Sequence, residues 1–214
     1  MMNLKFIAIA GATALLASSP LSAATFTGEF WDANTGLSSI AGAEAVIAGG
    51  AATATFDAAF IDFPNGSTDT YGDGTLLSTF LGGYASNLSG GDTSTLTYSV
   101  FRFTGYIDLA AGSNIFAVGS DDGFVLRMNG DTVASYDGNR SFATTTVTSD
   151  EGTGPTAFEL IYWENGGVTG VEFYVDGELA APVDGMAAVP VPATLPLLAA
   201  GLGGLAVLRR RRKA

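Results

Sequence analysis

The polar chemistry of this sequence is concentrated in two adjacent carboxylates, Asp121 and Asp122, which are followed by Gly123. Apolar runs flank them on both sides, so the pair is expected in a turn between two strands. Adjacent side chains of an extended backbone point to opposite sides, and a cis peptide bond is one geometry that would bring them together. Two converging carboxylates would suit a hard cation such as calcium, which prefers oxygen ligands.

The chain has no Cys and no His. Their absence excludes Ser-His-Asp and Cys-His catalysis, the usual zinc sites and disulfide bonds. The kinds of site that remain possible are one that uses carboxylate chemistry, one that binds a metal through oxygen ligands, or none at all. Glu159 and Glu172 lie on neighbouring predicted strands and are the candidate acid and nucleophile of a glycosidase, whose carboxyl groups must lie about 5 to 9.5 Å apart.

The charge is distributed unevenly along the chain. All 21 acidic residues lie between residues 25 and 188, with only three of the nine basic residues, Arg102, Arg127 and Arg140, so this body carries a net charge of −18. Such a surface argues against nucleic acid or anionic lipid as a partner. It is compatible with cation binding and with uncharged glycans.

The body between the two ends is predicted to be one all-β domain, an antiparallel β-sandwich. Glycine is abundant, with 29 residues, and no segment of the body keeps a 3.6-residue apolar period. Asn129-Gly130 between apolar runs predicts a tight hairpin. Besides the strands around Asp121 and this hairpin, strands are predicted at 26–31, 51–63, 95–109, 143–148, 157–163 and 168–175.

Several connections are less regular. Residues 37–50 are compatible with a short helix or an extended crossover, and 66–91 are expected to be loop. The apolar phase of 95–109 shifts midway, which predicts a bulge or bend where the strand changes sheets. The last two strands are expected to pair through the connection 164–167, and Trp31 and Trp163 to lie in the core, with stacking on sugars as the alternative.

The N-terminal residues 1–24 have the layout of a signal peptide. Lys5 precedes an apolar stretch, and small residues close the segment before any acidic residue appears. Cleavage is expected after Ala23 or Ala24, which predicts export.

The other end of the chain carries a second targeting pattern. After a spacer at 183–188, residues 189–214 contain the motif VPVPA, an apolar run and the cluster RRRRK. The run is long enough for a transmembrane helix only with the motif included, and its terminal cations would stay cytoplasmic. The rival interpretation of RRRRK as a nucleic-acid-binding tail does not explain the adjoining apolar run.

This three-part tail resembles the PEP-CTERM class of sorting signals in its VPLPA-like variant, although the usual Pro-Glu-Pro core is absent. The resemblance implies an exosortase-type membrane enzyme as partner, in a bacterium that makes extracellular polysaccharide.

Residues 116–130, FAVGSDDGFVLRMNG, resemble the signature of the β-sandwich found at the N-terminus of anthrax protective antigen, which is shared with yeast flocculin and GLEYA-type adhesins. Residues 26–31 resemble the family's opening strand, and 158–173 its closing strands. The resemblance implies a lectin-like jelly roll over residues 25–182.

The same resemblance implies the chemistry of the acidic turn. In adhesin members an adjacent Asp pair joined by a cis peptide binds calcium, and the ion contacts sugar hydroxyls. Asp121 and Asp122 match that pair, and Asn165 is the best match for an Asn that a second loop adds. Asp137 and Asn139 lie in a candidate specificity loop, with a plain turn as the alternative.

We therefore expect an exported protein of the cell surface or extracellular matrix with a calcium-assisted, glycan-binding β-sandwich. The alternatives are a structural matrix protein whose acidic turn has no ligand, and a glycosidase.

Overall fold

The computed structural model describes residues 24–64 and 69–186. The helices are α1 (Ile40–Gly49), α2 (Leu77–Leu81) and the 3₁₀ helix η1 (Gly82–Asn87). The strands are β1 (Phe26–Asp32), β2 (Ala54–Ala58), β3 (Asp62–Phe63), β4 (Tyr71–Gly72), β5 (Ser89–Gly90), β6 (Ser99–Leu109), β7 (Asn114–Asp121), β8 (Gly123–Met128), β9 (Asp131–Tyr136), β10 (Ala143–Ser149), β11 (Gly154–Glu164), β12 (Val168–Val175) and β13 (Glu178–Leu179).

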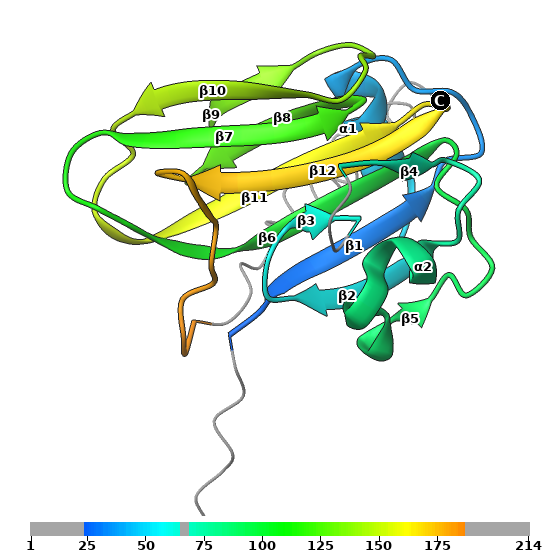
Figure 1. The fold of residues 1–214 in the computed structure, drawn as a ribbon, viewed down its shortest axis with the longest axis horizontal. Coiled ribbons are helices and arrows are strands. Elements are labelled where there is room, and N and C mark those ends of the chain that lie inside the picture. The colour runs from blue at the N-terminus through cyan, green and yellow to red at the C-terminus, as the bar shows by residue number, and fades with distance from the viewer. Residues whose placement is uncertain (1–23, 65–68, 187–214) are drawn as a thin grey trace, which may run out of the picture.

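The strands form two sheets that face each other (Figure 1). One sheet has seven strands in the order β5-β2-β1-β6-β11-β8-β9. The other has the order β10-β7-β12-β13, with β3 and β4 also paired to β12. Every one of these strand pairs is antiparallel. The prediction of an antiparallel β-sandwich is therefore confirmed.

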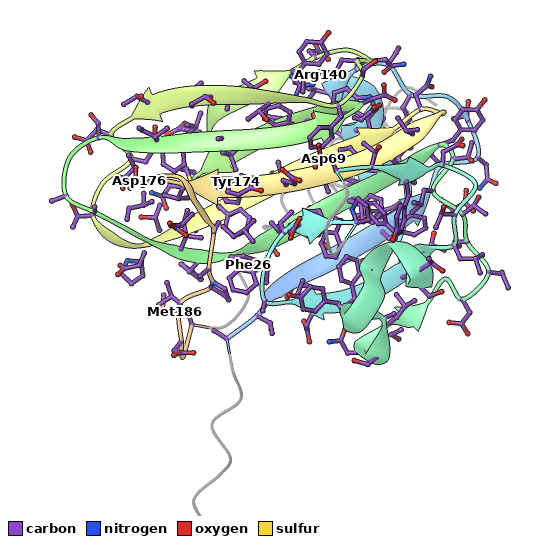
Figure 2. The ribbon with its side chains drawn as sticks, viewed as in Figure 1. Phe26, Asp69, Arg140, Tyr174, Asp176 and Met186 are labelled. Atoms are coloured by element: carbon purple, nitrogen blue, oxygen red, sulfur yellow. The ribbon has the colours of Figure 1, made fainter. Side chains whose placement is uncertain are left out.

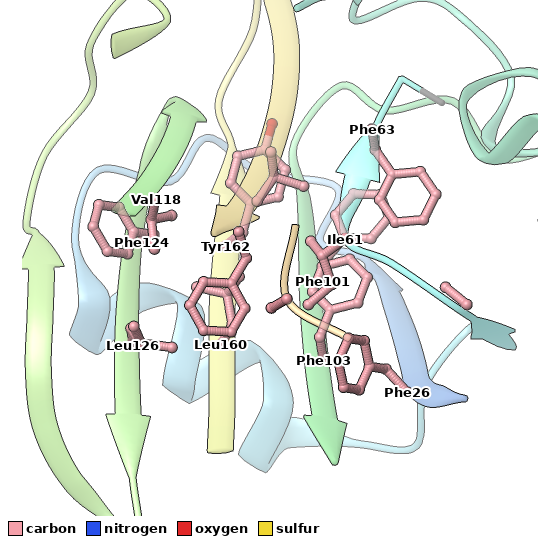
Figure 3. Packing of buried hydrophobic residues seen from close by; sticks show 14 of the residues in the cluster. Phe26, Ile61, Phe63, Phe101, Phe103, Val118, Phe124, Leu126, Leu160 and Tyr162 are labelled. Atoms are coloured by element: carbon pink, nitrogen blue, oxygen red, sulfur yellow. The ribbon is translucent and has the colours of Figure 1, made fainter. Parts of the chain in front are cut away.

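The core between the sheets is dominated by phenylalanine (Figure 3). Phe101 and Phe103 alternate on β6 and are fully buried, and the ring of Phe103 stacks on that of Phe63 with centroids 5.8 Å apart. From β11, Leu160 and Tyr162 point into the same layer. Burying one such side chain contributes about 1.5 to 3 kcal/mol, so this layer stabilises both sheets together.

Helix α1 covers the outer face of the seven-stranded sheet. The segment is rich in alanine, which favours helix, and Ser39 caps it by accepting a hydrogen bond from the Gly42 N–H at 3.2 Å. A second apolar cluster lies beneath it, including Trp31, which is 5% exposed, and Trp163, which is fully buried. The helix alternative for residues 37–50 is thus the one observed, and both tryptophans lie in the core, as predicted.

Two predictions for the first half of the body are wrong. Residues 51–63 form two strands, because the chain crosses between the sheets after β2, which pairs with β1, and before β3, which pairs with β12. The described residues of the expected loop 66–91 contain α2, η1 and the short strands β4 and β5.

The expected change of sheet within residues 95–109 is also not observed, because β6 stays in the seven-stranded sheet over its whole length. Its apolar phase shifts for another reason. Phe101 and Phe103 face the core between the sheets, whereas Val100 faces the second cluster beneath α1. Near the start of β6 both faces of the strand are covered, so the residues on both faces are apolar.

The chain crosses between the sheets at two later points that the sequence suggested were hairpins. β7 and β8 flank the acidic turn but belong to different sheets, and so do β11 and β12. The Asn129-Gly130 hairpin is confirmed: β8 pairs with β9, and both turn residues have positive φ angles of 50° and 95°. The predicted edge strand at 143–148 corresponds to β10.

The predicted signal peptide and sorting signal lie outside the described residues, apart from Ala24. In the ranges 24–64 and 69–186, neither α-helix is long and apolar enough to cross a bilayer. The start and end of the described chain meet, since the Ala24 N–H donates to the Asp184 carboxylate at 3.2 Å.

Candidate functional site

The two crossings between the sheets meet at one end of the sandwich. Asp121, the last residue of β7, is opposite Gly170 of β12, and Gly123, the first residue of β8, is opposite Trp163 of β11. The connection 137–142 between β9 and β10 reaches the same end. Figure 2 shows Arg140 of that connection near the end of β7, whereas Asp176 lies at the opposite end of the sandwich.

Three carboxylates converge at this end. The peptide bond between Asp121 and Asp122 is cis. Each of Asp121, Asp122 and Glu164 offers a carboxylate oxygen within 4.8 Å of the other two. The three residues are 4%, 5% and 0% exposed, respectively. Buried carboxylates this close are stable only when protonated or paired with positive charge.

The two aspartates differ in their hydrogen bonds. Both oxygens of Asp122 accept from backbone N–H groups, Oδ1 from Arg140 at 3.1 Å and Oδ2 from Asn165 at 2.7 Å. Asp121 accepts one backbone hydrogen bond, from Phe142. Its Oδ2 atom is buried without any partner, the one such side-chain atom among the described residues. A cation would satisfy this oxygen.

Glu164 was not among the predicted site residues. It lies at the end of β11, where Phe158, Leu160 and Tyr162 alternate into the core. Glu164 is the next position on the same face, so the period-2 pattern already aimed this carboxylate inward. That alternation is the signal by which the sequence could have identified it.

The electrostatics of the ion-free cluster follow from burial and mutual repulsion. Burial, and then the Asp122 charge, raise the pKa of Asp121 to about 6. Burial also raises the pKa of Asp122, although backbone hydrogen bonds from Asn165 and Arg140 oppose this. Burial and the Asp122 charge raise the pKa of Glu164 to about 9. A bound cation would favour the charged form of each group.

The turn is held by close packing. A Cβ at Gly123 would lie 2.1 Å from Cζ2 of Trp163 and 2.5 Å from the Gly138 carbonyl oxygen, so only glycine fits there. Arg140 donates to Ser120 through its side chain, and its guanidinium lies 4.5 Å from the centre of the Tyr136 ring. These contacts fix the 137–142 connection against the acidic turn.

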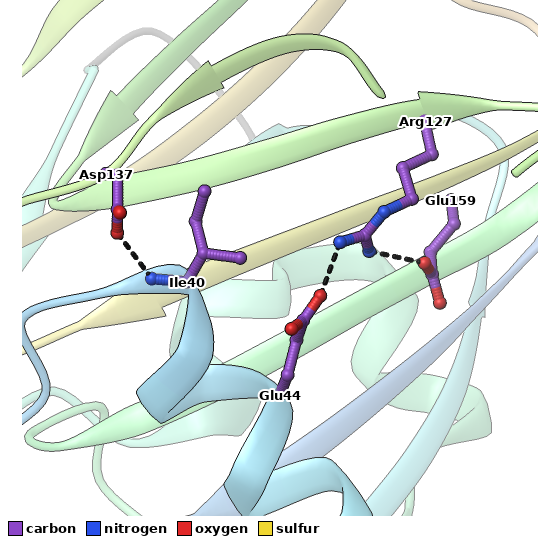
Figure 4. A network of polar contacts seen from close by, with 5 residues as sticks. All are labelled: Ile40, Glu44, Arg127, Asp137 and Glu159. Atoms are coloured by element: carbon purple, nitrogen blue, oxygen red, sulfur yellow. Dashed lines mark hydrogen bonds and ion pairs between the residues drawn. The ribbon is translucent and has the colours of Figure 1, made fainter. Parts of the chain in front are cut away.

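The other predicted ligands surround the cluster, and each contacts the protein itself. Asn165 gives its backbone N–H to Asp122, while its side-chain oxygen accepts from the Leu37 N–H at 2.8 Å. The Asp137 carboxylate accepts from the N–H of Ile40, the first residue of α1 (Figure 4).

Asn139 accepts a hydrogen bond from the indole of Trp163 at 3.3 Å. The structure therefore places Asn139, Asp137 and Asn165 beside the acidic turn, and their roles in ligand binding stay predictions.

The structure does not bring together the two glutamates of the glycosidase alternative. Glu159 lies on the outer face of the seven-stranded sheet, where Arg127 bonds to it at 2.9 Å and also to Glu44 of α1 (Figure 4). Glu172 lies on β12 in the other sheet, on the side facing away from the buried Val171 and Phe173. Packed sheets are about 10 Å apart, so carboxylates that point outward from both lie too far apart to flank one glycosidic bond.

No protein-family model and no curated protein matches this chain. Among solved structures, it is similar to the PA14 domain of the antifreeze protein MpAFP, with 32% identity, a TM-score of 0.64, and 82% of this chain and 96% of that one covered. It is also similar to a PA14 sugar-binding domain from an RTX adhesin, with 31% identity, a TM-score of 0.61, and 76% and 100% covered.

A third similar structure shares the fold at low identity. It is the Epithelial Adhesin 6 A domain from Candida glabrata in complex with Galβ1-3GlcNAc, with 11% identity, a TM-score of 0.50, and 81% and 90% covered. The two PA14 domains are more than 30% identical to this chain over nearly their whole length. This chain therefore belongs to the PA14 domain family.

Proposed function

We propose that this protein binds carbohydrate through a calcium ion held at the acidic turn by Asp121 and Asp122, with Asn165 as a further oxygen ligand. The observation that carries the proposal is the buried Oδ2 atom of Asp121, which has no partner and faces a cluster of carboxylates. Carboxylate and amide oxygens are the ligands that calcium prefers. The residues present therefore fit this ion.

The glycan part of the proposal is supported by family membership. The PA14 domain from an RTX adhesin, 31% identical to this chain, is described as sugar-binding. Calcium takes six to eight oxygen ligands, more than the protein side chains named here supply. Hydroxyl groups of a sugar would complete its coordination, with Asp137 and Asn139 in the neighbouring connection as the candidate specificity residues.

A glycan array probed in calcium and in chelator tests this function. We expect binding in calcium that chelator abolishes and that Asp121→Asn removes. The matched control is Asp108→Asn, which changes an exposed acid on β6 at the other end of the sandwich. Calcium-independent binding, or equal binding by Asp121→Asn, would contradict the proposal. No calcium binding at all would favour the alternative of a structural matrix protein without ligand.

We further propose that the protein is exported and acts at the cell surface or in the extracellular matrix, a location that its adhesin-like relatives support. The sequence pattern of residues 1–24 supports export, and that of 189–214 supports a transmembrane segment sorted by an exosortase-type enzyme. Mass spectrometry of the protein isolated from the cell envelope tests both. Peptides that begin after Ala23 or Ala24 are expected, and intact residues 1–24 would refute export by this signal.

A further inference from the structure

Glu164 is a buried acid at the site that the proposed function leaves unused. It is fully buried at the end of β11, and its Oε1 atom accepts a hydrogen bond from the Gly166 N–H. The ion pairs of the described residues involve Arg102 and Arg127 only, and none includes Glu164. Within residues 24–64 and 69–186, therefore, no basic side chain forms an ion pair with this carboxylate.

The second oxygen of Glu164 has one long hydrogen-bond contact among the described residues. Its Oε2 atom lies 3.4 Å from the Tyr162 hydroxyl oxygen, which is long for a hydrogen bond between oxygens. The same hydroxyl makes a much shorter contact with the backbone oxygen of Asp121. A tyrosine hydroxyl has one proton to donate, so the shorter contact to Asp121 takes it.

The other two neighbours of the Tyr162 hydroxyl, Thr169 and Gly170, contact the tyrosine oxygen. The Thr169 hydroxyl lies 2.6 Å from the Tyr162 oxygen, and the Gly170 N–H donates to it at 3.2 Å. Tyr162 thus contacts the acidic turn through the backbone oxygen of Asp121, and a carboxylate oxygen of Glu164 lies within 4.8 Å of the other two carboxylates.

We propose that Glu164 is a direct ligand of the cation, through Oε2, together with Asp121 and Asp122. This inference rests on the proposed function, because it needs a cation at the acidic turn. Oδ2 of Asp121 has no partner, Oε2 of Glu164 has only the long contact with Tyr162, and the two residues, from different strands, belong to the same cluster of carboxylates. Each would gain a partner from one ion.

A third carboxylate changes the charge of the loaded site. Two carboxylates neutralise one Ca²⁺, whereas three leave a net charge of −1 and match a trivalent lanthanide ion. The affinity for Tb³⁺ relative to Ca²⁺ therefore reports whether Glu164 ligates as a carboxylate. If Glu164 served only as a neutral hydrogen-bonding group, its replacement by glutamine would leave this ratio of affinities unchanged.

The test is titration of the full chain with Ca²⁺ and with Tb³⁺, followed by calorimetry and by lanthanide luminescence. Glu164→Gln keeps the length of the side chain and an oxygen for the Gly166 N–H but removes the charge. We expect it to weaken Ca²⁺ binding roughly tenfold or more, and Tb³⁺ binding by a larger factor, since affinity at such sites follows the charge of the ligands. The matched control is Glu178→Gln, which changes an exposed acid of β13 and should leave both affinities within about twofold.

Each outcome decides the inference. If Asp121→Asn loses Ca²⁺ binding while Glu164→Gln binds as the native protein does, the role of Glu164 is refuted and the proposed function stands. If the native protein binds neither ion, both fail together. Should Glu164→Gln not fold, Glu164→Asp decides: it keeps the charge but withdraws the carboxylate by one methylene, and unchanged affinity there would overturn the inference.

Discussion

The substitution Asp121→Asn should make the protein more stable without calcium and less stable with it. In the ion-free protein, burial and the neighbouring Asp122 raise the pKa of Asp121 from 3.8 to about 6. A tenfold change in proton affinity corresponds to about 1.4 kcal/mol. The charged carboxylate therefore lowers the free energy of unfolding by an amount on the order of 3 kcal/mol at pH 7.5. This cost is absent at low pH, where the carboxyl group is protonated, and it appears as the pH rises through about 6.

An asparagine removes this charge and keeps an oxygen for the Phe142 N–H. For a chain of this size 1 kcal/mol shifts the melting temperature by about 2 to 4 °C, so in chelator a gain on the order of 3 kcal/mol should make the variant melt roughly 6 to 12 °C above the native protein. Free calcium at about a thousand times its Kd adds about 4.1 kcal/mol to a protein that binds it. Native protein should then gain roughly 8 to 16 °C, which is more than the advantage of the variant in chelator.

Differential scanning calorimetry of both proteins at pH 7.5, in calcium and in chelator, measures all four melting temperatures. The expected result is a crossing, with the variant higher in chelator and the native protein higher in calcium. Asp108→Asn, the exposed control, should follow the native protein in both conditions. A variant that is less stable in chelator would refute the electrostatic reasoning, and an equal calcium response in both proteins would refute the placement of the ion.

Further predictions concern the supports of the site and the core. Gly123→Ala forces a methyl group to within 2.1 Å of a ring carbon of Trp163, so it should cost about 1 to 3 kcal/mol and lower the melting temperature in calcium and in chelator alike; an unchanged melting temperature would contradict the packing. In chelator, unfolding stability should fall as pH rises from 5 to 9, because the pKa of Glu164 is raised from 4.5 to about 9 and the folded protein keeps a proton that the unfolded chain loses; urea titrations across this range would refute it if stability rose. Arg127→Gln should cost about 1 kcal/mol in urea unfolding, since two ion pairs on a largely covered surface are lost, and should leave the calcium response unchanged. Phe103→Ala should cost about 3 to 5 kcal/mol in the same assay, because a fully buried ring is removed; a cost below 1 kcal/mol would refute its place in the core.

The positions of most strands were predictable because side-chain alternation is local. In β11 and β12 the alternation along each strand places Phe158, Leu160 and Val171 on inward faces, and all three are buried. The Asn129-Gly130 turn specified its hairpin, because both residues tolerate the positive φ angles that it requires. These features depend only on neighbours in the chain.

Which strands pair was decided by tertiary structure. A period-2 pattern shows which side of a strand is buried but not which sheet the strand joins. The predicted pairing of β11 with β12 is therefore wrong, and the strands on either side of the acidic turn, β7 and β8, also lie in different sheets. The change of sheet predicted within 95–109 is wrong for a related reason. Helix α1 covers the outer face of β6 near Val100, and a pattern for one buried face does not describe a strand that is buried on both.

The sequence by itself determined that the site is built from carboxylates, because the chain has no Cys or His and its acids include the adjacent pair Asp121-Asp122. Tertiary structure alone decided that Glu164 joins them, since it is 42 residues away from Asp122 and meets it only where both crossings reach one end of the sandwich. It also decided that Glu159 and Glu172 are kept apart by two packed sheets. Residue types are fixed along the chain, but distances between remote carboxylates are set by the pairing of strands.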